Sequence, residues 1–318
     1  MFKNVMVYRI GPAWAMTLEQ LEERLQAARF AECGLTQEKS VGWTPPRGEA
    51  HGVLVESIGN QWILKLMMES KMVPSTVIAR KVKERAQQIE AATGRKPGKK
   101  EMKELKEEAR LTLMPMAFTK QASVVVWINP SERLLVIDAA SQGKADEVLT
   151  CLAKSMDGLG AMQMQTTISP VAAMSDWLLS QEPPAGFSVD RECELKASDD
   201  SKAVVRYSRH ALDIEEVQQH ITRGKLPTRL AMTWEGRVSF VLTETFQIKK
   251  LSFVEGVFQD HSSSSKDDRF DADAAIATGE IAKLIPDLLG ALGGELIMGA
   301  APAAAQAPID GSVDLSPF

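Results

Sequence analysis

The 318-residue sequence contains few of the residues that build metal centres, disulfide frameworks or nucleophilic active sites. Its three cysteines lie far apart and form no C-x-x-C pair, which predicts small buried apolar side chains rather than a zinc site or a disulfide. They are Cys33, Cys151 and Cys193. The four histidines show no metal-ligand spacing, and G-x-S-x-G and H-E-x-x-H are both missing. They are His51, His210, His220 and His261. We therefore expect no cofactor, no small-molecule substrate and no enzyme activity, although a triad assembled in space stays open.

Long apolar runs are missing as well, so the sequence predicts no membrane-crossing segment and no membrane partner. The N-terminal letters MFKNVMVYRIG lack the order of charged, apolar and small residues typical of a signal peptide. With 44% hydrophobic and 25% charged residues, the composition is that of a globular protein. We expect a cytoplasmic protein of about two or three domains.

Charge is distributed unevenly. The formal net charge is −5, but the residues from 255 to the end contain 11 acidic and 3 basic side chains, so residues 1–254 carry +3. Between Arg80 and Arg110 there are 11 basic and 6 acidic residues, a local net charge of +5. Aromatic residues are scarce, and only Tyr207 and Phe118 lie near the groups of clustered basic residues, which disfavours single-strand binding by base stacking.

Hydrophobic periodicity predicts an α+β fold with an antiparallel sheet at its centre. A strand over 5–10 precedes a helix in which Leu18, Leu21 and Leu25 share one face behind a Thr17 N-cap. Further strands are expected over 52–59, 61–68, 122–130 and 133–141, near 202–209, and three times between 228 and 253. Further helices are expected over 74–92, 99–114, 143–156, 170–180, 213–224 and 271–294. The prolines and glycines of GWTPPRG at 42–48 predict a loop.

The helices over 74–92 and 99–114 are expected to form a helical hairpin that projects from the sheet, with its turn at TGRKPG. Three parts and a tail follow from the order of the elements. They are a central α+β domain of residues 1–73 and 115–168, the hairpin at 74–114, a C-terminal α+β domain at 169–298, and a tail at 299–318. The tail consists mostly of alanine, proline and other small residues and is expected to be disordered.

Two tempting motifs fail on inspection. GRKPGKK at 94–100 has three residues between its glycines where a P-loop needs four, lacks the following Ser or Thr, and contains Pro97, which has no amide hydrogen. DDRFDAD at 267–273 lacks the ligand spacing of a calcium loop. Its acids are better explained as favourable charges at a helix N-terminus.

Basic clusters are the informative feature. Four basic residues surround the Gly/Pro turn of the hairpin, three lie on its first helix, and two further groups follow the strand near 202–209 and the next helix. The candidate DNA-binding residues are Arg80, Lys81, Lys83, Arg95, Lys96, Lys99, Lys100, Arg206, Arg209, His210, Lys225 and Arg229. Lysine and arginine contacts to phosphates give salt-dependent, sequence-independent affinity. Charge alone leaves open a solvated helical surface without a partner.

The order of several segments along the chain resembles the recombination-associated protein RdgC family. The resemblance covers residues 2 to about 295 and rests on eight collinear pieces. They are FKNVMVYRI, GWTPPRG, ESKMVPSTVI, LMPMAF, LLVIDAASQGKADEVL, ECELK, VVRYSRHALDIEEVQQHITRGK and RFDADAAIATGEIAKLIPDLLGALGG.

This resemblance implies a non-enzymatic protein that binds double-stranded DNA with little sequence preference. It implies a horseshoe-shaped subunit that closes into a homodimeric ring with a basic hole, through contacts of the hairpin and of the C-terminal domain. It also implies a functional partnership with the RecA recombinase, which the family restrains, and an association with the nucleoid. An acidic total charge is compatible with a basic hole.

Residue by residue, the family's basic hairpin tip falls on Arg95, Lys96 and Lys99, and its ring contact falls on Phe118. A lysine and glutamine pair near DNA falls on Arg209 and His210, which keeps one sure positive charge. Met116 stands where the family commonly has arginine.

Two other functions stay open at this point. The basic hairpin could meet acidic protein surface in a regulator that binds the recombinase directly and touches DNA little. A carboxylate-dependent nuclease would use Asp267, Asp268, Asp271 and Asp273.

Overall fold

The computed structural model describes residues 1–254, 256–257 and 265–296. The predicted tail at 299–318, His261 and most of the polar segment before 265 lie outside the described residues. Within the described part of the chain, no helix combines the length and apolar composition that crossing a bilayer requires.

The described strands form one large antiparallel sheet, which confirms the α+β prediction. Its main path runs β2-β4-β5-β6-β1-β12-β11-β10-β8-β9, with β3 paired to β4 and β7 paired to β1. The strands are β1 (Val5–Arg9), β2 (Lys39–Thr44), β3 (Val55–Ile58), β4 (Gln61–Met72), β5 (Phe118–Asn129), β6 (Leu134–Asp138), β7 (Met162–Gln163), β8 (Phe187–Ala197), β9 (Val204–Ser208), β10 (Lys225–Trp234), β11 (Val238–Thr243) and β12 (Ile248–Phe253).

Two helical layers pack on the sheet. The helices are α1 (Leu18–Gln26), α2 (Ser75–Thr93), α3 (Lys99–Leu113), α4 (Gln142–Ser155), α5 (Pro170–Ser180), α6 (Glu215–Thr222) and α7 (Lys266–Ala291), with a short 3₁₀ turn at Met114–Met116. One core joins α5, α6 and α7 to one face of the sheet, and a second core joins α1 and α4 to the opposite face. Alternate residues of β1 show this division, since Val5 and Val7 lie in the first core and Met6 and Tyr8 in the second.

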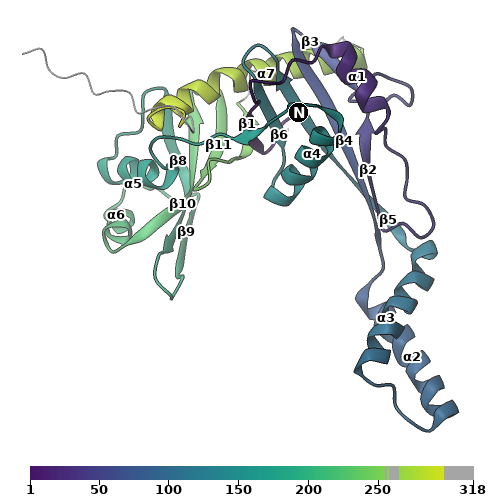
Figure 1. The fold of residues 1–318 in the computed structure, drawn as a ribbon. Coiled ribbons are helices and arrows are strands. Elements are labelled where there is room, and N and C mark those ends of the chain that lie inside the picture. The colour runs from purple at the N-terminus through teal and green to yellow at the C-terminus, as the bar shows by residue number, and fades with distance from the viewer. Residues whose placement is uncertain (255, 258–264, 297–318) are drawn as a thin grey trace, which may run out of the picture.

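The molecule has the shape of an arch (Figure 1). α7 runs along its outer side, and α4 lies under it between two arms. One arm consists of β8, β9 and β10 with α5 and α6 on the outside, and the other is the long β4–β5 ladder that ends in α2 and α3. We call the face of the sheet that carries α1 and α4 the inner face. No described helix packs on the inner face of β8, β9 and β10.

The predicted hairpin is present, and it projects because β4 and β5 pair from Trp62↔Ile128 out to Met72↔Phe118. α2 ends at Gly94, whose φ of 71° is the left-handed conformation that glycine adopts at little cost. The hairpin has its own small core. Its buried members are Ile78, Val82, Leu105 and Ala109, with Ala86, Ile89 and Leu113 packed against them. Arg85 is exposed, and its neighbour Ala86 packs against this core.

Three local predictions were wrong. The segment over 42–48 is not all loop, because Gly42 to Thr44 complete β2. Gly42 is there for close approach: a Cβ on it would meet the Phe30 Cα at 2.5 Å. β8 was missed altogether. Of the three cysteines only Cys193 is buried, while Cys33 and Cys151 are half-buried; all three are free.

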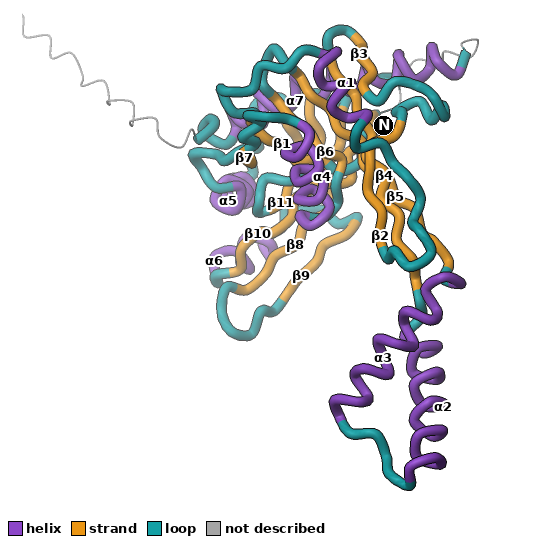
Figure 2. Tube along the Cα trace, turned by 45° about the vertical axis from the view of Figure 1, so that its right-hand side comes forward, coloured by secondary structure: helices purple, strands orange, loops and turns teal. Residues whose placement is uncertain are grey.

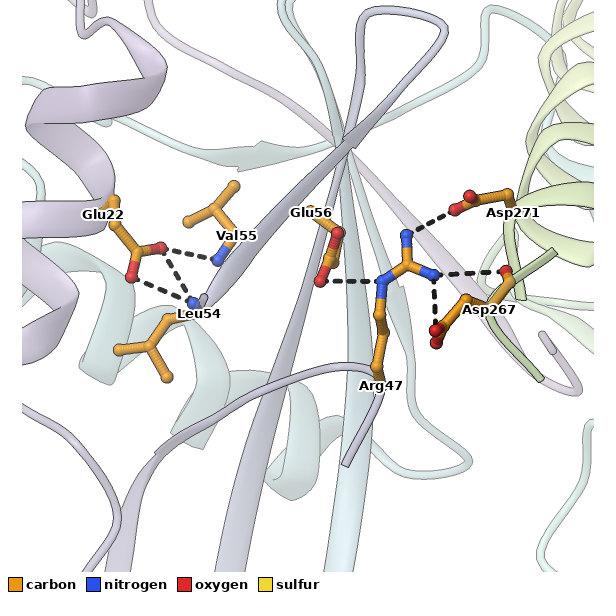
Figure 3. Close-up of polar contacts among 7 residues, drawn as sticks. All are labelled: Glu22, Arg47, Leu54, Val55, Glu56, Asp267 and Asp271. Atoms are coloured by element: carbon orange, nitrogen blue, oxygen red, sulfur yellow. Dashed lines mark hydrogen bonds and ion pairs between the residues drawn. The ribbon is translucent and has the colours of Figure 1, made fainter. Parts of the chain in front are cut away.

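Arg47 fastens the N-terminal turn of α7 to the other half of the molecule (Figure 3). Its Nε lies 3.0 Å from Glu56 Oε1 on β3, one terminal nitrogen bonds Asp271, and the other donates to the Asp267 carbonyl oxygen at 3.2 Å. The guanidinium also lies 4.8 Å from the ring centroid of Phe270. The Arg47 side chain is only 17% exposed, so these partners replace most of its hydration.

Replacing Arg47 by alanine should therefore lower the free energy of unfolding by about 2–3 kcal/mol, because three carboxylates lose a partly buried partner. Urea unfolding followed by circular dichroism measures the change. The matched control is Arg24→Ala, since Arg24 meets Asp157 at 3.5 Å with both side chains largely exposed. It should change the stability by less than about 0.5 kcal/mol. Equal effects of the two substitutions would contradict the role given to Arg47.

Candidate nucleic-acid interface

The inner face of β8, β9 and β10 carries a row of charged side chains. Cys193 and Leu195 of β8 and Tyr207 of β9 point into the core, so their sequence neighbours Glu194 and Arg206 lie on the inner face. Glu194 pairs with Arg206 on one side and with Arg229 of β10 on the other. The antiparallel register therefore brings two of the predicted basic residues together.

Both arginines meet one carboxylate. Arg206 Nε donates to Glu194 Oε2 at 2.6 Å, and Arg229 Nε lies 4.0 Å from Glu194 Oε1. The Thr228 hydroxyl also donates to Oε1 at 2.8 Å. Burial by itself would raise the pKa of Glu194, but the bonds from Arg206 and Thr228 and the nearby positive charges outweigh it and hold that pKa below its usual value. The carboxylate is ionised at neutral pH.

Arg209 and His210 follow β9 and are both exposed. Arg209 has a φ of 55°, the left-handed conformation that is uncommon for a residue with a side chain. The His210 backbone N–H donates to the Arg191 carbonyl at 3.1 Å, and its Nδ1 lies 2.8 Å from the Ala211 carbonyl oxygen. The backbone bond anchors the turn that presents both side chains to solvent.

Lys225 does not join this group. Its Nζ lies 3.2 Å from Nδ1 of His220 on α6, which packs on the opposite face of the sheet. Leu226, the next residue, is the one that pairs with Lys196 on the inner face. Simple alternation would put Lys225 and Arg229, four residues apart, on one face, but the register shift between Pro227 and Arg229 puts them on opposite faces.

Some of the basic side chains at the hairpin tip are paired with glutamates. Arg95 makes two bonds to Glu101, at 2.8 and 2.7 Å, and Lys96 lies 4.0 Å from Glu90. The charge of Arg95 is therefore paired locally. Among the described residues, Lys99 and Lys100 have no carboxylate within ion-pair distance, so they carry the unpaired charge of the tip.

The basic residues of α2 are spread around the helix. Arg80 Nε lies 4.0 Å from Glu84, and both are exposed. Lys81 borders a small hollow on one side of the hairpin, together with Leu105 and Glu108. Lys83 borders the other side. These three residues therefore do not form one patch.

A groove of about 860 Å³ lies between α2 and α3, which separate towards their connecting loop (Figure 2). Its floor is apolar and its rim is basic. The apolar lining residues include Ile78, Ala79, Val82, Ala86 and Met102, and the charged ones are Lys83, Lys96 and Lys106 with one acid, Glu90, beside Lys96.

Exposed apolar side chains gather where the hairpin joins the sheet. Phe118 is 87% exposed and pairs across the ladder with Met72, which is 57% exposed. Met116 and Leu111 nearby in sequence are also exposed. A large ring so fully in contact with water is unusual for a surface without a partner.

The four aspartates at 267–273 mostly serve the helix they belong to. Asp268 and Ser265 form a reciprocal cap at the start of α7, and Asp267 and Asp271 hold Arg47. Asp267 and Asp268 lie in the first turn of α7, as the explanation from helix-terminal charge expects, whereas Asp271 lies beyond that turn and binds Arg47. Among the described residues, no group of three or more His, Cys, Asp or Glu side chains is arranged to hold a metal ion.

Sequence reasoning missed the two acidic residues that organise the basic ones. Glu101 lies in a glutamate-rich helix, and Glu194 in a strand that was not predicted. The sequence signal for this strand was the alternation in ECELK, where the apolar Cys193 and Leu195 flank the charged Glu194.

Comparison with known proteins gives a consistent result. A family model described as "Putative exonuclease, RdgC" matches residues 1–295. The chain is 42% identical to the recombination-associated protein RdgC of Dechloromonas aromatica over 301 residues, covering 93% of this chain and 98% of that one. It is 45% identical to the protein of the same name from Herminiimonas arsenicoxydans over 296 residues, and 44% identical to that of Bordetella parapertussis over 298. In both comparisons the match covers 92% of this chain and 98% of the other.

The Arg95–Glu101 contact generates a pH prediction. The Arg95 bonds, helped by the Gly98 N–H, lower the pKa of Glu101 from 4.5 to about 2. A lowered pKa means that the contact is fully present above about pH 4.5 and is lost as the pH falls through about 2. In Arg95→Ala, NMR titration of the Glu101 carboxyl carbon should show its midpoint rising towards 4.5. Lys99→Ala is the control and should leave it in place. An unchanged midpoint in Arg95→Ala would refute the contact.

Proposed function

Because the chain belongs to the RdgC family of recombination-associated proteins, we propose that it binds double-stranded DNA without sequence preference and encircles it as a homodimeric ring. In this role it restrains RecA-mediated recombination and is associated with the nucleoid. The observation that carries the proposal is the arch itself: the inner face of one arm carries exposed arginines without a covering helix, and the other arm ends in a basic hairpin.

The chemistry of both arms suits phosphates. Arg206 and Arg229 have side chains that are 72% and 49% exposed, and Arg209 is exposed at the next turn. Lys99 and Lys100 offer unpaired charge at the hairpin tip. Tyr207, the aromatic neighbour of Arg206, packs in the core, so the surface favours the backbone of a duplex over unstacked bases.

The proposed division into a central domain, a hairpin and a C-terminal domain gives each part a role. The central domain and α7 form the span of the arch, and the β4–β5 ladder of the central domain extends into one arm, which ends in the hairpin. The C-terminal domain forms the other arm. A two-fold dimer that joins hairpin to hairpin and C-terminal domain to C-terminal domain would close a ring around the inner faces.

Phe118 suits the hairpin contact. It is the most exposed large apolar side chain of its region, and the apolar groove between α2 and α3 offers a second copy a surface to cover it. An isologous contact of this kind needs both features on one chain, and both are present.

A duplex-binding experiment tests the DNA proposal. Affinity for a fluorescent duplex should fall steeply with added salt, with a log–log slope of several units if on the order of five to ten phosphates are contacted. Replacing Lys99 and Lys100 by alanine should weaken binding to unrelated duplexes by a similar factor. Loss confined to one sequence would indicate base reading, and affinity independent of salt would argue against phosphate contacts.

The oligomeric state tests the ring. Phe118→Asp would bury a charge at the hairpin contact and should therefore weaken the closed ring. Light scattering at micromolar concentration should then give a lower mass. Met162→Asp is the matched control, since Met162 is 57% exposed and lies on β7, which pairs with β1 rather than with the strands that lead to the hairpin. A strict monomer in the unmodified protein, with and without duplex, would exclude the ring.

One observation favours a second candidate function, a regulator that binds the recombinase directly. The groove between α2 and α3 combines an apolar floor with a basic rim, which also suits an acidic amphipathic segment of a protein. Mixing the protein with naked duplex in the absence of recombinase separates the two functions. Adding magnesium to the same mixture tests the nuclease activity that the family model's description names; we expect the duplex to stay intact.

A further inference from the structure

We propose that Glu194 is a positioning residue, which holds Arg206 and Arg229 in a fixed orientation so that the pair grips backbone phosphates of duplex DNA. The inference rests on the proposed function and adds to it an acidic residue on a surface meant for an anion. It assigns the two arginines to one composite site rather than to two independent charges.

The placement of the three residues follows from the strand order. β8 lies between β9 and β10, and Glu194 is the cross-strand partner of Arg206 in one ladder and of Arg229 in the other. Directly opposed side chains share one face of a sheet and lie about 5 Å apart at Cβ. The ladder register thus sets two guanidinium groups on either side of one carboxylate.

The contacts with Glu194 involve Nε of each arginine and leave the N–H donors of the terminal nitrogens free. Glu194 Oε2 accepts from Arg206 at Nε, and the nearest nitrogen of Arg229 to Oε1 is also Nε. A guanidinium has five N–H donors, four of them on its two terminal nitrogens. Among the described residues, no hydrogen bond or ion pair engages the terminal nitrogens of either arginine. Each arginine can therefore present a planar fork to a phosphate, Arg206 with its Nε hydrogen-bonded to Glu194 and Arg229 with its Nε attracted to Glu194 across 4.0 Å.

Glu194 is more buried than the two arginines, as expected for a residue that supports them. The Glu194 side chain is 14% exposed, and the Thr228 hydroxyl fixes its second oxygen, whereas Arg206 is 72% exposed and Arg229 49%. The carboxylate is thus the buried support, and the two guanidinium groups are the parts of the cluster that face solvent. Two cations and one anion leave the cluster with one net positive charge.

A neighbouring pair shows what a simple surface ion pair looks like. Glu192, two residues earlier on the same strand and face, meets Lys250 Nζ at 2.5 Å. A lysine ammonium has three rotatable N–H donors but no planar fork, so holding it fixes no bidentate donor pattern for a ligand. Glu192 and Glu194 therefore match in charge, strand and face and differ in what they hold.

The two possible roles of Glu194 predict opposite signs. If it only subtracts charge from a basic surface, removing it should tighten DNA binding, because phosphate affinity follows positive charge. If it positions the arginines, removing it should weaken binding although the surface becomes more positive. Without Glu194, both arginine side chains would lose conformational entropy when they bind DNA, and this loss weakens the affinity.

The experiment measures duplex affinity at fixed salt for Glu194→Gln, Glu194→Ala and the controls Glu192→Gln and Glu192→Ala. We expect about three- to tenfold weaker binding for both Glu194 variants, in the range of ordinary coupling between contacting residues. The Glu192 variants should bind as tightly as the unmodified protein or more tightly. In an Arg206→Ala/Arg229→Ala background, Glu194→Ala should cause no further loss, because nothing is left to position.

The affinities of these variants decide whether Glu194 positions the arginines. Glu194 variants that bind as tightly as the unmodified protein or more tightly overturn the proposal, and so does a further loss in the double-arginine background. Urea unfolding checks the fold; if Glu194→Ala unfolds, Glu194→Gln decides, because its amide oxygen still accepts from Thr228. Failure of the unmodified protein to bind any duplex would instead sink the proposed function.

Discussion

The narrow junction between two halves of one sheet is the constraint on which the rest of the structure depends. β1 pairs with β6 along its whole length, but its register with β12 consists of Val5↔Ile248. A neighbouring bond from the Leu251 N–H to the Lys3 carbonyl at 2.8 Å extends the contact. A junction this short would be a weak point if the sheet had to hold the two arms of the arch by itself.

α7 reinforces the junction from the outer side. Its apolar stripe packs against strands of both halves, and Ala274, Ala277, Ile281, Leu284 and Leu288 are fully buried. Arginines from separate parts of the chain hold it along its length: Arg47 at its first turn, Arg237 through two bonds to Glu280, and Arg9 through Glu295 just beyond its end. Glu280 is a buried carboxylate whose pKa the Arg237 bonds lower, so it stays charged and paired at neutral pH. The arch keeps its shape because α7 bridges the two halves in addition to the short β1–β12 pairing.

The same geometry explains how an acidic protein can offer a basic surface. The acids of the C-terminal region are used on the outer side, where Asp267, Asp271 and Glu280 bind arginines of the scaffold. On the inner face and at the hairpin tip, single glutamates hold arginines without matching the local positive charge. Net charge is a property of the whole chain, whereas the field that a ligand meets depends on which side of the sheet each residue faces.

The sequence by itself determined the element types of most of the chain, the antiparallel α+β class and the projecting hairpin, because hydrophobic periodicity and the residues of turns and caps act over a few neighbouring positions. It also determined the family, through pieces spread over nearly the whole chain. It could not show that Gly42 belongs to a strand, since the reason is the backbone of Phe30 lying against it. Only the tertiary structure decided that Arg206 and Arg229 meet at Glu194 while Lys225 faces the other way, and that Glu101 holds Arg95. The physical reason is that strand register and helix packing join residues far apart in the chain, and a count of charges along the sequence contains no information about those contacts.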